Sequence, residues 1–499
     1  MTDSHFFSRL LRKNLWLYFF SFIIAPTGYI VKIVMTGTVS PEDYGVFAAV
    51  ISFVMVLGSY NDFGIADSLN FFLPEHFKNK NTHKITQTFA IALVTQIISS
   101  TLIALILYLF ARYLSAHYFS APVAYDLLLV FIWFFFWDNV FRSINTFFQA
   151  NQDVVLQKFT DFLRNFFQAA IVVWVAVTGR QGIIEYAWAY NASVLLWVIV
   201  SLIFLVSKYR SYFHRSSWRF SFVEFSTVFK YALFVMLSAN ISVLLSQLDT
   251  QMITLMLGTT EAGYYNLYLS LIRIPFMFLL PGVYFLFPVF SDLIKRGEIS
   301  TIRTLQGFVY QLFATLAIIM TSFFMLFGDV LTTTLFGASY VTAASILLFS
   351  SPFLLFNFLL QIDFQILNAS GKPRTKMLIL LSAVAVNLAT NYIFIRLFGV
   401  EWSALASGIG WVYIWYLSSR AISEYRGVFR WSLFFRNLVG FTLLSWVLSS
   451  LHLTEFLEGR WHLFFGICGV IGIYCIVFCL LNMDQLKRLK HLFHHRTLW

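Results

Sequence analysis

Charged residues are scarce in this sequence. Asp, Glu, Lys and Arg make up 11% of its 499 residues, hydrophobic residues make up 59%, and the mean hydropathy is +0.76. A soluble globular protein carries roughly 25% charged residues because its surface faces water. The low charge excludes a soluble fold and favours one whose surface faces lipid. We therefore expect an all-α polytopic membrane protein.

Residue combinations that would support catalysis or cofactor binding are also missing. The cysteines lack the paired short spacing of a zinc site, because Cys468, Cys475 and Cys479 are spread along one apolar segment. No histidine lies deep in an apolar segment, and no phosphate-binding G-x-x-x-x-G-K-[ST] run occurs. The longest connection between apolar segments, Lys208–Phe225, is too short for a catalytic domain. We expect no metal, no cofactor and no enzymatic activity.

Long hydrophobic runs, in contrast, fill most of the chain. A transmembrane helix needs roughly 20 predominantly apolar residues, and about fourteen segments meet that requirement. The first of them is too long for the hydrophobic region of a signal peptide. The predicted spans are 14–36, 44–72, 86–111, 122–150, 154–178, 183–207, 226–256, 262–291, 303–328, 340–368, 376–398, 402–422, 434–451 and 462–481.

Lys and Arg indicate how these spans are oriented, because short loops rich in them stay on the cytoplasmic side. When the loops are assigned alternately to the two sides, most of the 34 Lys and Arg residues fall on one side. The other side receives only Arg112, Arg180, Arg396 and Arg460. This asymmetry predicts that both termini are cytoplasmic. The net charge of +11 is spread over many short loops, which favours anionic lipid headgroups over nucleic acid as the partner.

The two halves of the chain resemble each other. The turn around Gly45 resembles the turn around Gly263, and the segment ending near Ala150 resembles the segment ending near Ala369, at offsets of 218 and 219 residues. Two copies of a six-helix unit share one orientation and are related by an axis along the membrane normal, an arrangement found in transporters. We therefore predict two pseudo-symmetric six-helix bundles, 1–220 and 221–430, followed by two extra helices and a cytoplasmic tail in 431–499.

Several short motifs follow one another in a fixed order. They are Ser40–Gly45, Asp62–Ile65, Gly263–Asn266, Asn368–Lys372, Asn387–Gly399 and Ser403–Ala406. In this order they resemble the polysaccharide transporters of the multidrug/oligosaccharidyl-lipid/polysaccharide superfamily, the Wzx-type flippases. The resemblance covers roughly residues 10–425. It implies a protein that moves an isoprenyl-diphosphate-linked glycan from the cytoplasmic to the outer leaflet, and it implies a cationic cavity between two bundles.

Some ionisable residues lie inside the predicted spans, where a charge at the bilayer centre costs about 2.5–3.5 kcal/mol and marks a candidate functional residue. We expect the bases to bind the diphosphate, because a guanidinium can donate two hydrogen bonds to one anion. Two structural alternatives stay open: Asp138 and Arg142 have the spacing of a helix-surface pair, and Lys32 can extend to the membrane interface. The substrate-binding candidates are Arg164, Arg273, Arg142 and Lys32, and the coupling or charge-balancing candidates are Asp249 and Asp138.

The predicted function is that of a flippase for undecaprenyl-diphosphate-linked repeat units, working by alternating access in the bacterial cytoplasmic (inner) membrane during synthesis of lipopolysaccharide O-antigen, capsule or exopolysaccharide. The expected partners are this lipid-linked glycan, membrane lipids, a polysaccharide polymerase and a chain-length regulator, with a proton or sodium ion as the candidate coupling ion. An ion-coupled small-molecule (multidrug-type) exporter of the same superfamily is the alternative, although the two extra helices and the basic residues count against it. A membrane glycan polymerase is disfavoured because the outer loops are short.

Overall fold

The computed structural model describes residues 26–213, 222–451 and 460–482, and these residues form helices and no strands. The predicted cytoplasmic location of the termini, and the first part of the predicted span 14–36, lie outside the described residues. Residues 26–36 are helical. The helices that follow are α2 (Pro41–Asn61), α3 (Ile65–Lys78), α4 (Thr82–Tyr113), α5 (Val123–Ala150), α6 (Val154–Val177), α7 (Ile183–Tyr209), α8 (Phe222–Leu257), α9 (Thr259–Ile272), α10 (Ile274–Arg296), α11 (Ile299–Phe336), α12 (Thr342–Ser350), α13 (Leu354–Ala369), α14 (Pro373–Phe398), α15 (Ser403–Ala421), α16 (Trp431–Ser450) and α17 (Arg460–Leu481).

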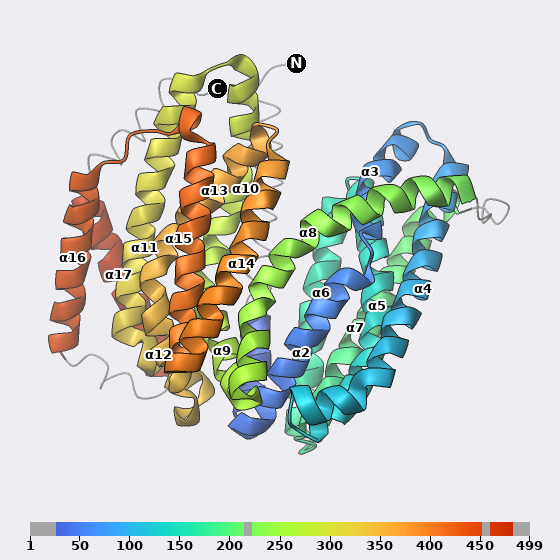
Figure 1. The fold of residues 1–499 in the computed structure, drawn as a ribbon, viewed down its shortest axis with the longest axis horizontal. Helices are drawn as coiled ribbons and strands as arrows, with labels where there is room; N and C mark the ends of the chain where they lie inside the picture. Colours follow the sequence, from blue (N-terminus) through green and yellow to red (C-terminus); the bar gives the residue numbers. More distant parts are fainter. Residues whose placement is uncertain (1–25, 214–221, 452–459, 483–499) are drawn as a thin grey trace. The chain divides into compact units, whose positions relative to one another are not determined.

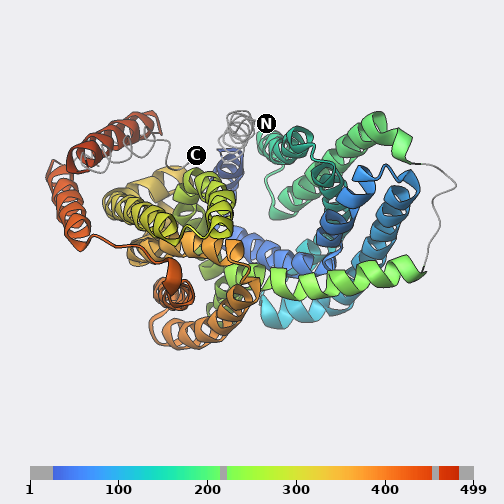
Figure 2. The same ribbon diagram turned by 90° about the horizontal axis from the view of Figure 1, so that it is seen from above.

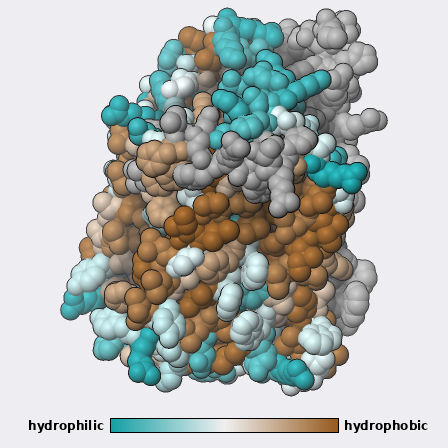
Figure 3. All heavy atoms as spheres, turned by 90° about the vertical axis from the view of Figure 1, so that its right-hand side faces the viewer, coloured by the Kyte–Doolittle hydropathy of each residue, from teal (hydrophilic) through white to brown (hydrophobic). Residues whose placement is uncertain are grey.

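Several of these helices have the length and composition of membrane spans. Within the described ranges, nine are long and apolar enough to cross a bilayer. One of them is α4, which exposes a run of large apolar side chains that includes Ile98, Leu102, Leu105 and Leu109. Figure 3 shows hydrophobic side chains forming a band between two more polar ends on one face of the molecule. The chain is therefore a multi-pass α-helical membrane protein, as predicted, and the count of fourteen spans stays a prediction.

The chain divides into two compact units, one comprising Trp16–Leu267 and the other mainly Tyr268–Trp499. In the first unit α5 is central and packs against α2, α3, α4, α6 and α7. Helix α8 runs along one side of this unit and contacts α2, α3 and α4 (Figures 1 and 2). The core around α5 is aromatic, because Phe131, Phe135, Phe147 and Phe148 are all fully buried.

In the second unit α13 is central. It packs against α10, α11, α14 and α15, while α16 packs against α11 and α17. Helix α5 ends at Ala150 and α13 ends at Ala369, the two residues that the internal repeat matches. The central helices of the two units are thus the pair that the repeat predicts to be equivalent. The domain boundaries expected from the repeat, 1–220, 221–430 and 431–499, stay a prediction.

The two glycines matched by the repeat, Gly45 of α2 and Gly263 of α9, pack directly against each other. A Cβ atom at Gly45 would lie 2.5 Å from the carbonyl oxygen of Thr259, and a Cβ at Gly263 would lie 2.7 Å from the Cα of Gly45. No side chain fits in either place. These motif glycines therefore allow the backbones of α2 and α9 to approach each other closely.

Candidate functional site

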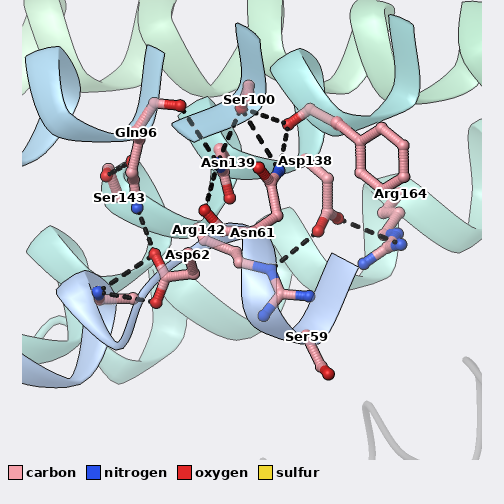
Figure 4. Close-up of polar contacts among 12 residues, drawn as sticks. Ser59, Asn61, Asp62, Gln96, Ser100, Asp138, Asn139, Arg142, Ser143 and Arg164 are labelled. Carbon is pink, nitrogen blue, oxygen red and sulfur yellow. Dashed lines mark hydrogen bonds and ion pairs between the residues drawn. The ribbon is translucent and has the colours of Figure 1, made fainter. Parts of the chain in front are cut away.

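One buried carboxylate, Asp138 on α5, holds two arginines. Asp138 and Arg142 lie one helical turn apart on α5, so their side chains meet on one face. The Nε of Arg142 donates to Oδ2 of Asp138 at 2.7 Å, and a guanidinium nitrogen of Arg164, on α6, lies 3.6 Å from Oδ1 of the same carboxylate (Figure 4). These three residues, which we call the arginine cluster, carry one net positive charge.

The acid of the arginine cluster is buried, whereas its bases are partly open. The side chain of Asp138 is 7% exposed, that of Arg142 is 40% exposed and that of Arg164 is 31% exposed. Each guanidinium has five N–H donors, more than one shared carboxylate can accept. Both arginine side chains are thus partly exposed, and the planar fork of a guanidinium matches the oxygen spacing of a phosphate.

Trp197 of α7 packs against the guanidinium of Arg164. The guanidinium carbon of Arg164 lies 4.9 Å from the ring centroid of Trp197, which is fully buried. A cation–π contact of this kind contributes about 0.5–2 kcal/mol, and it orients the guanidinium plane. Trp197 could not be singled out from the sequence, because aromatic residues make up 19% of the chain and occur throughout the predicted spans.

A network of neutral polar side chains lies beside the arginine cluster and joins α5 to α2 and α4 (Figure 4). The Nδ2 of Asn139 donates to Oγ of Ser100 at 2.8 Å, and the Nδ2 of Asn61 donates to the same oxygen at 3.3 Å. Ser143 donates its hydroxyl hydrogen to Oε1 of Gln96. All five side chains are buried. We call them the amide network.

The amide network has a sequence signal that the prediction did not use. Gln96 and Ser100 are four residues apart on α4, and Asn139 and Ser143 are four residues apart on α5. Polar residues at this spacing lie on one face of an otherwise apolar helix. The prediction considered only ionisable residues inside the spans, so these neutral residues were missed.

A break between α2 and α3 adjoins the amide network. The sequence predicted one continuous span, 44–72, and this expectation is wrong, because α2 ends at Asn61 and α3 begins at Ile65. Asp62 lies in the break, where it accepts hydrogen bonds from Gln96 and, at 3.0 Å, from the N–H of Ala66. The carboxylate therefore takes the place of the helical hydrogen bonds that the break interrupts.

Backbone conformation explains why the break occurs at the Asp62–Ile65 motif. Phe63 and Gly64 have φ angles of 48° and 74°, in the left-handed region that favours glycine. A Cβ at Gly64 would also lie 2.2 Å from the carbonyl oxygen of Ala232 on α8. The motif thus serves both the turn and the close packing of α8 against it.

Two other predicted site residues are held by the Gly263–Asn266 motif of α9. The Nζ of Lys32 donates to Oδ1 of Asn266 at 2.8 Å. The hydroxyl of Tyr265 donates to Oδ2 of Asp249, on α8, at 2.8 Å. The motif that pointed to the family therefore supplies a polar partner for each of these intramembrane charges.

Arg273 belongs to the other unit. It is the N-cap residue of α10, in a break between α9 and α10, and its side chain is exposed. The helix over the predicted span 262–291 is therefore interrupted at Arg273. Pro275 in the first turn of α10 explains the break, because proline has no N–H to donate and its ring clashes with the preceding turn. The binding function expected of Arg273 stays a prediction.

Metal binding finds no support in the part of the chain that the structure describes. Within it, no group of three or more His, Cys, Asp or Glu side chains could hold a metal ion. The arginine cluster offers charge pairing and hydrogen bonding by its guanidinium groups.

Comparison with known families identifies the chain. Residues 10–294, more than half of its length, match the family model described as polysaccharide biosynthesis protein. The chain belongs to this family. It is also 25% identical over 418 residues to an uncharacterized membrane protein of Methanocaldococcus jannaschii, a match that covers 79% of this chain and 80% of that protein.

Solved transporter structures have a similar fold. The lipid II flippase MurJ in an inward closed conformation matches with a TM-score of 0.71 and 14% identity, covering 95% of this chain and all of that one. An inward-facing multidrug resistance MATE family transporter of the MOP superfamily also matches with a TM-score of 0.71 and 12% identity. This match covers 80% of this chain and 95% of the transporter. The MATE transporter VcmN of Vibrio cholerae in the bent form matches with a TM-score of 0.56 and 16% identity. This match covers 84% of this chain and 98% of the transporter. The fold of this family member is thus that of membrane transporters.

Proposed function

We propose that the protein is a flippase that moves an isoprenyl-diphosphate-linked oligosaccharide repeat unit from the cytoplasmic to the outer leaflet of a bacterial cytoplasmic membrane. The isoprenoid is undecaprenol, and the product serves surface polysaccharide synthesis together with a polymerase and a chain-length regulator. One observation carries the proposal: two partly exposed arginines share one buried carboxylate in a membrane protein of the polysaccharide biosynthesis family. A solved structure described as a lipid II flippase has the same fold, which supports the substrate class.

The arginine cluster has the charge that a transporter of a diphosphate needs. Arg142 and Arg164 attract the anion, and Asp138 cancels one of their two charges, so binding stays reversible. A site with two uncompensated arginines would hold a diphosphate more tightly and release it more slowly. In this proposal Lys32 and Arg273 are further substrate contacts, and Asp249 is the candidate for coupling to a proton or sodium ion. The bundles alternate between access to the two leaflets, with both termini in the cytoplasm.

Replacing Arg142 or Arg164 by Gln tests the proposal. Each hydrogen bond to a charged group contributes about 1.5–3 kcal/mol, so we expect each variant to flip the lipid-linked repeat unit roughly 10- to 100-fold more slowly. The measurement is the accumulation of undecaprenyl-diphosphate-linked repeat units on the inner leaflet when the variant replaces the native gene. Unaltered turnover of these intermediates in both variants would refute the proposal.

Arg296→Gln is the matched control. Arg296 forms an ion pair with Asp292 at the same four-residue spacing, 2.8 Å long, but both side chains are more than half exposed and, among the described residues, no second arginine pairs with this acid. We expect this variant to flip the lipid at close to the native rate. If deletion of the gene leaves lipid-linked intermediates normal and changes drug sensitivity instead, the protein is an exporter of small molecules.

A further inference from the structure

The connection between the second unit's α15 and α16 is fixed against α11 by two buried glutamines. The Oε1 of Gln306 accepts a hydrogen bond from the backbone N–H of Gly427 at 2.7 Å, and the Oε1 of Gln311 accepts one from the N–H of Arg430 at 3.1 Å. Both glutamine side chains are buried. The connection Arg426–Arg430 is therefore held in one place rather than loosely joining two helices.

Close backbone packing fixes the same connection. A Cβ at Gly427 would lie 2.0 Å from the carbonyl oxygen of Arg303 on α11, so only glycine fits there. Arg426 and Arg430, on either side of this contact, are exposed. Two guanidinium-bearing side chains thus project from a backbone whose position α11 determines.

The N-terminus of α16 lacks the groups that normally neutralise a helix start. Its N-cap residue is Arg430, which makes no side-chain cap, and no acidic residue lies in the first turn. A cation at the positive end of a helix dipole is unfavourable unless an anion binds there, and free N–H groups at a helix start favour such binding. The buried Nε2 of Gln311, whose side chain points at this N-cap, has no acceptor among the described residues. The start of α16 therefore combines a basic N-cap residue, a first turn without an acid and a buried amide donor that has no acceptor among the described residues.

An apolar stripe continues from these arginines along α16. Its side chains recur every three or four residues, which places them along one side of the helix. All of them are exposed: Trp431, Phe435, Val439, Leu443 and Trp446. A ligand that fits this surface has a negative group at one end and a hydrocarbon chain at the other.

We propose that Arg426, Arg430 and the N-terminus of α16, here called the headgroup site, bind the phosphate of an acidic phospholipid whose acyl chains lie along the apolar stripe. The predicted orientation places this site at the cytoplasmic leaflet, where anionic lipids attract basic residues near the membrane surface. The site lies within one unit and does not depend on the arginine cluster. It would anchor the two extra helices to the bilayer independently of transport.

Photo-crosslinking tests this assignment. The full-length protein is reconstituted in phosphatidylcholine vesicles that contain a photoactivatable phosphatidylglycerol, and the crosslinked peptides are mapped by mass spectrometry. We expect the label on residues 426–439, displaced by unlabelled phosphatidylglycerol and not by phosphatidylcholine. Each basic residue near an anionic membrane surface changes the affinity for an acidic lipid roughly fivefold. The double variant Arg426→Gln/Arg430→Gln should therefore bind phosphatidylglycerol at this site about 30-fold more weakly.

The control variant is Arg112→Gln/Arg396→Gln, which removes two exposed arginines elsewhere in the chain and should leave the label on residues 426–439 unchanged. Equal displacement by phosphatidylcholine in the native protein would overturn the proposal, whatever the variants do. So would an unchanged label in the Arg426→Gln/Arg430→Gln variant. Displacement by inorganic phosphate as effective as that by phosphatidylglycerol would mean that the site recognises a soluble anion and not a lipid.

Discussion

The second unit of the protein contains a neutral counterpart of the arginine cluster. At an offset of 219 residues, Asp138 and Arg142 correspond to Asn357 and Gln361 on α13. The Nε2 of Gln361 donates to Oδ1 of Asn357 at 3.1 Å, so the uncharged pair makes the same one-turn contact as the charged pair. The double substitution Asp138→Asn/Arg142→Gln would therefore install in α5 a contact that α13 already tolerates.

The structure sets the size of each expected effect. Removing one partner of a buried ion pair costs about 3–5 kcal/mol. Because Arg142 and Arg164 are about a third exposed, we expect Asp138→Asn alone to lower the free energy of unfolding by a smaller amount, about 1–3 kcal/mol. It leaves two arginines facing each other without their acid. The double variant removes one of those arginines, so about 1 kcal/mol or more of the loss should be recovered.

The assay compares stability with transport in the same variants. Thermal unfolding in detergent measures stability, and accumulation of lipid-linked repeat units measures flipping. We expect the double variant to be nearly as stable as the native protein and to flip at least about 10-fold more slowly. Flipping at the native rate in a stable double variant would refute the view that the charges of this pair serve transport. A double variant less stable than Asp138→Asn would refute the equivalence of the two pairs.

Two further predictions concern the backbone and a loop acid. Gly64→Ala should lower the free energy of unfolding by at least about 2 kcal/mol and so lower the melting temperature. The reason is that φ is 74° and the new Cβ would lie 2.2 Å from the carbonyl oxygen of Ala232. Gly179→Ala, with a similar φ of 75° but open space around it, should cost only about 1 kcal/mol, and equal losses in thermal unfolding would contradict the packing argument. At the α5–α6 turn, burial opposes ionisation of Asp153, but hydrogen bonds, above all from Lys208, hold the pKa of this carboxyl below its ordinary value. The lowered pKa means that its stabilising effect is complete above about pH 5 and disappears as the pH falls below about 4, so the melting temperatures of the native protein and Asp153→Asn should converge in acid. A difference that persists unchanged at low pH would contradict this assignment.

Sequence analysis could predict the contacts that form within one helix. Asp138 and Arg142 are four residues apart, so their pairing follows from helical geometry alone. The contact between Arg164 and Asp138 joins two helices, and it depends on how α5 and α6 are rotated about their axes. That rotation depends on contacts with neighbouring helices, and the one local signal for it, the spacing of Asn139 and Ser143 on α5, was not used. For the same reason Trp197 could not be predicted as the support of Arg164.

The helix breaks show a second limit of sequence analysis. Hydropathy averages over roughly 20 residues, so it treated 44–72 and 262–291 as single spans. The breaks at Asp62–Gly64 and at Arg273 occupy only one to three residues each. Glycine and proline mark both positions, but many glycines and prolines in membrane helices cause no break. At the first break, the carbonyl oxygen of Ala232 leaves no space for a side chain at Gly64, and this contact between helices is not visible in the sequence around Gly64.

The position of the arginine cluster follows from the two faces of α5. Asp138 and Asn139 are adjacent in the chain, as are Arg142 and Ser143. The charged residues and the residues of the amide network therefore lie on neighbouring faces of α5. If α5 rotated about its axis, Asn139 and Ser143 would lose their hydrogen-bond partners and face apolar side chains. Each unsatisfied group would cost about 1–3 kcal/mol of stability. The hydrogen bonds of the neutral face thus fix the orientation of the charged face. Uncharged, buried polar residues therefore help to determine where Arg142 points.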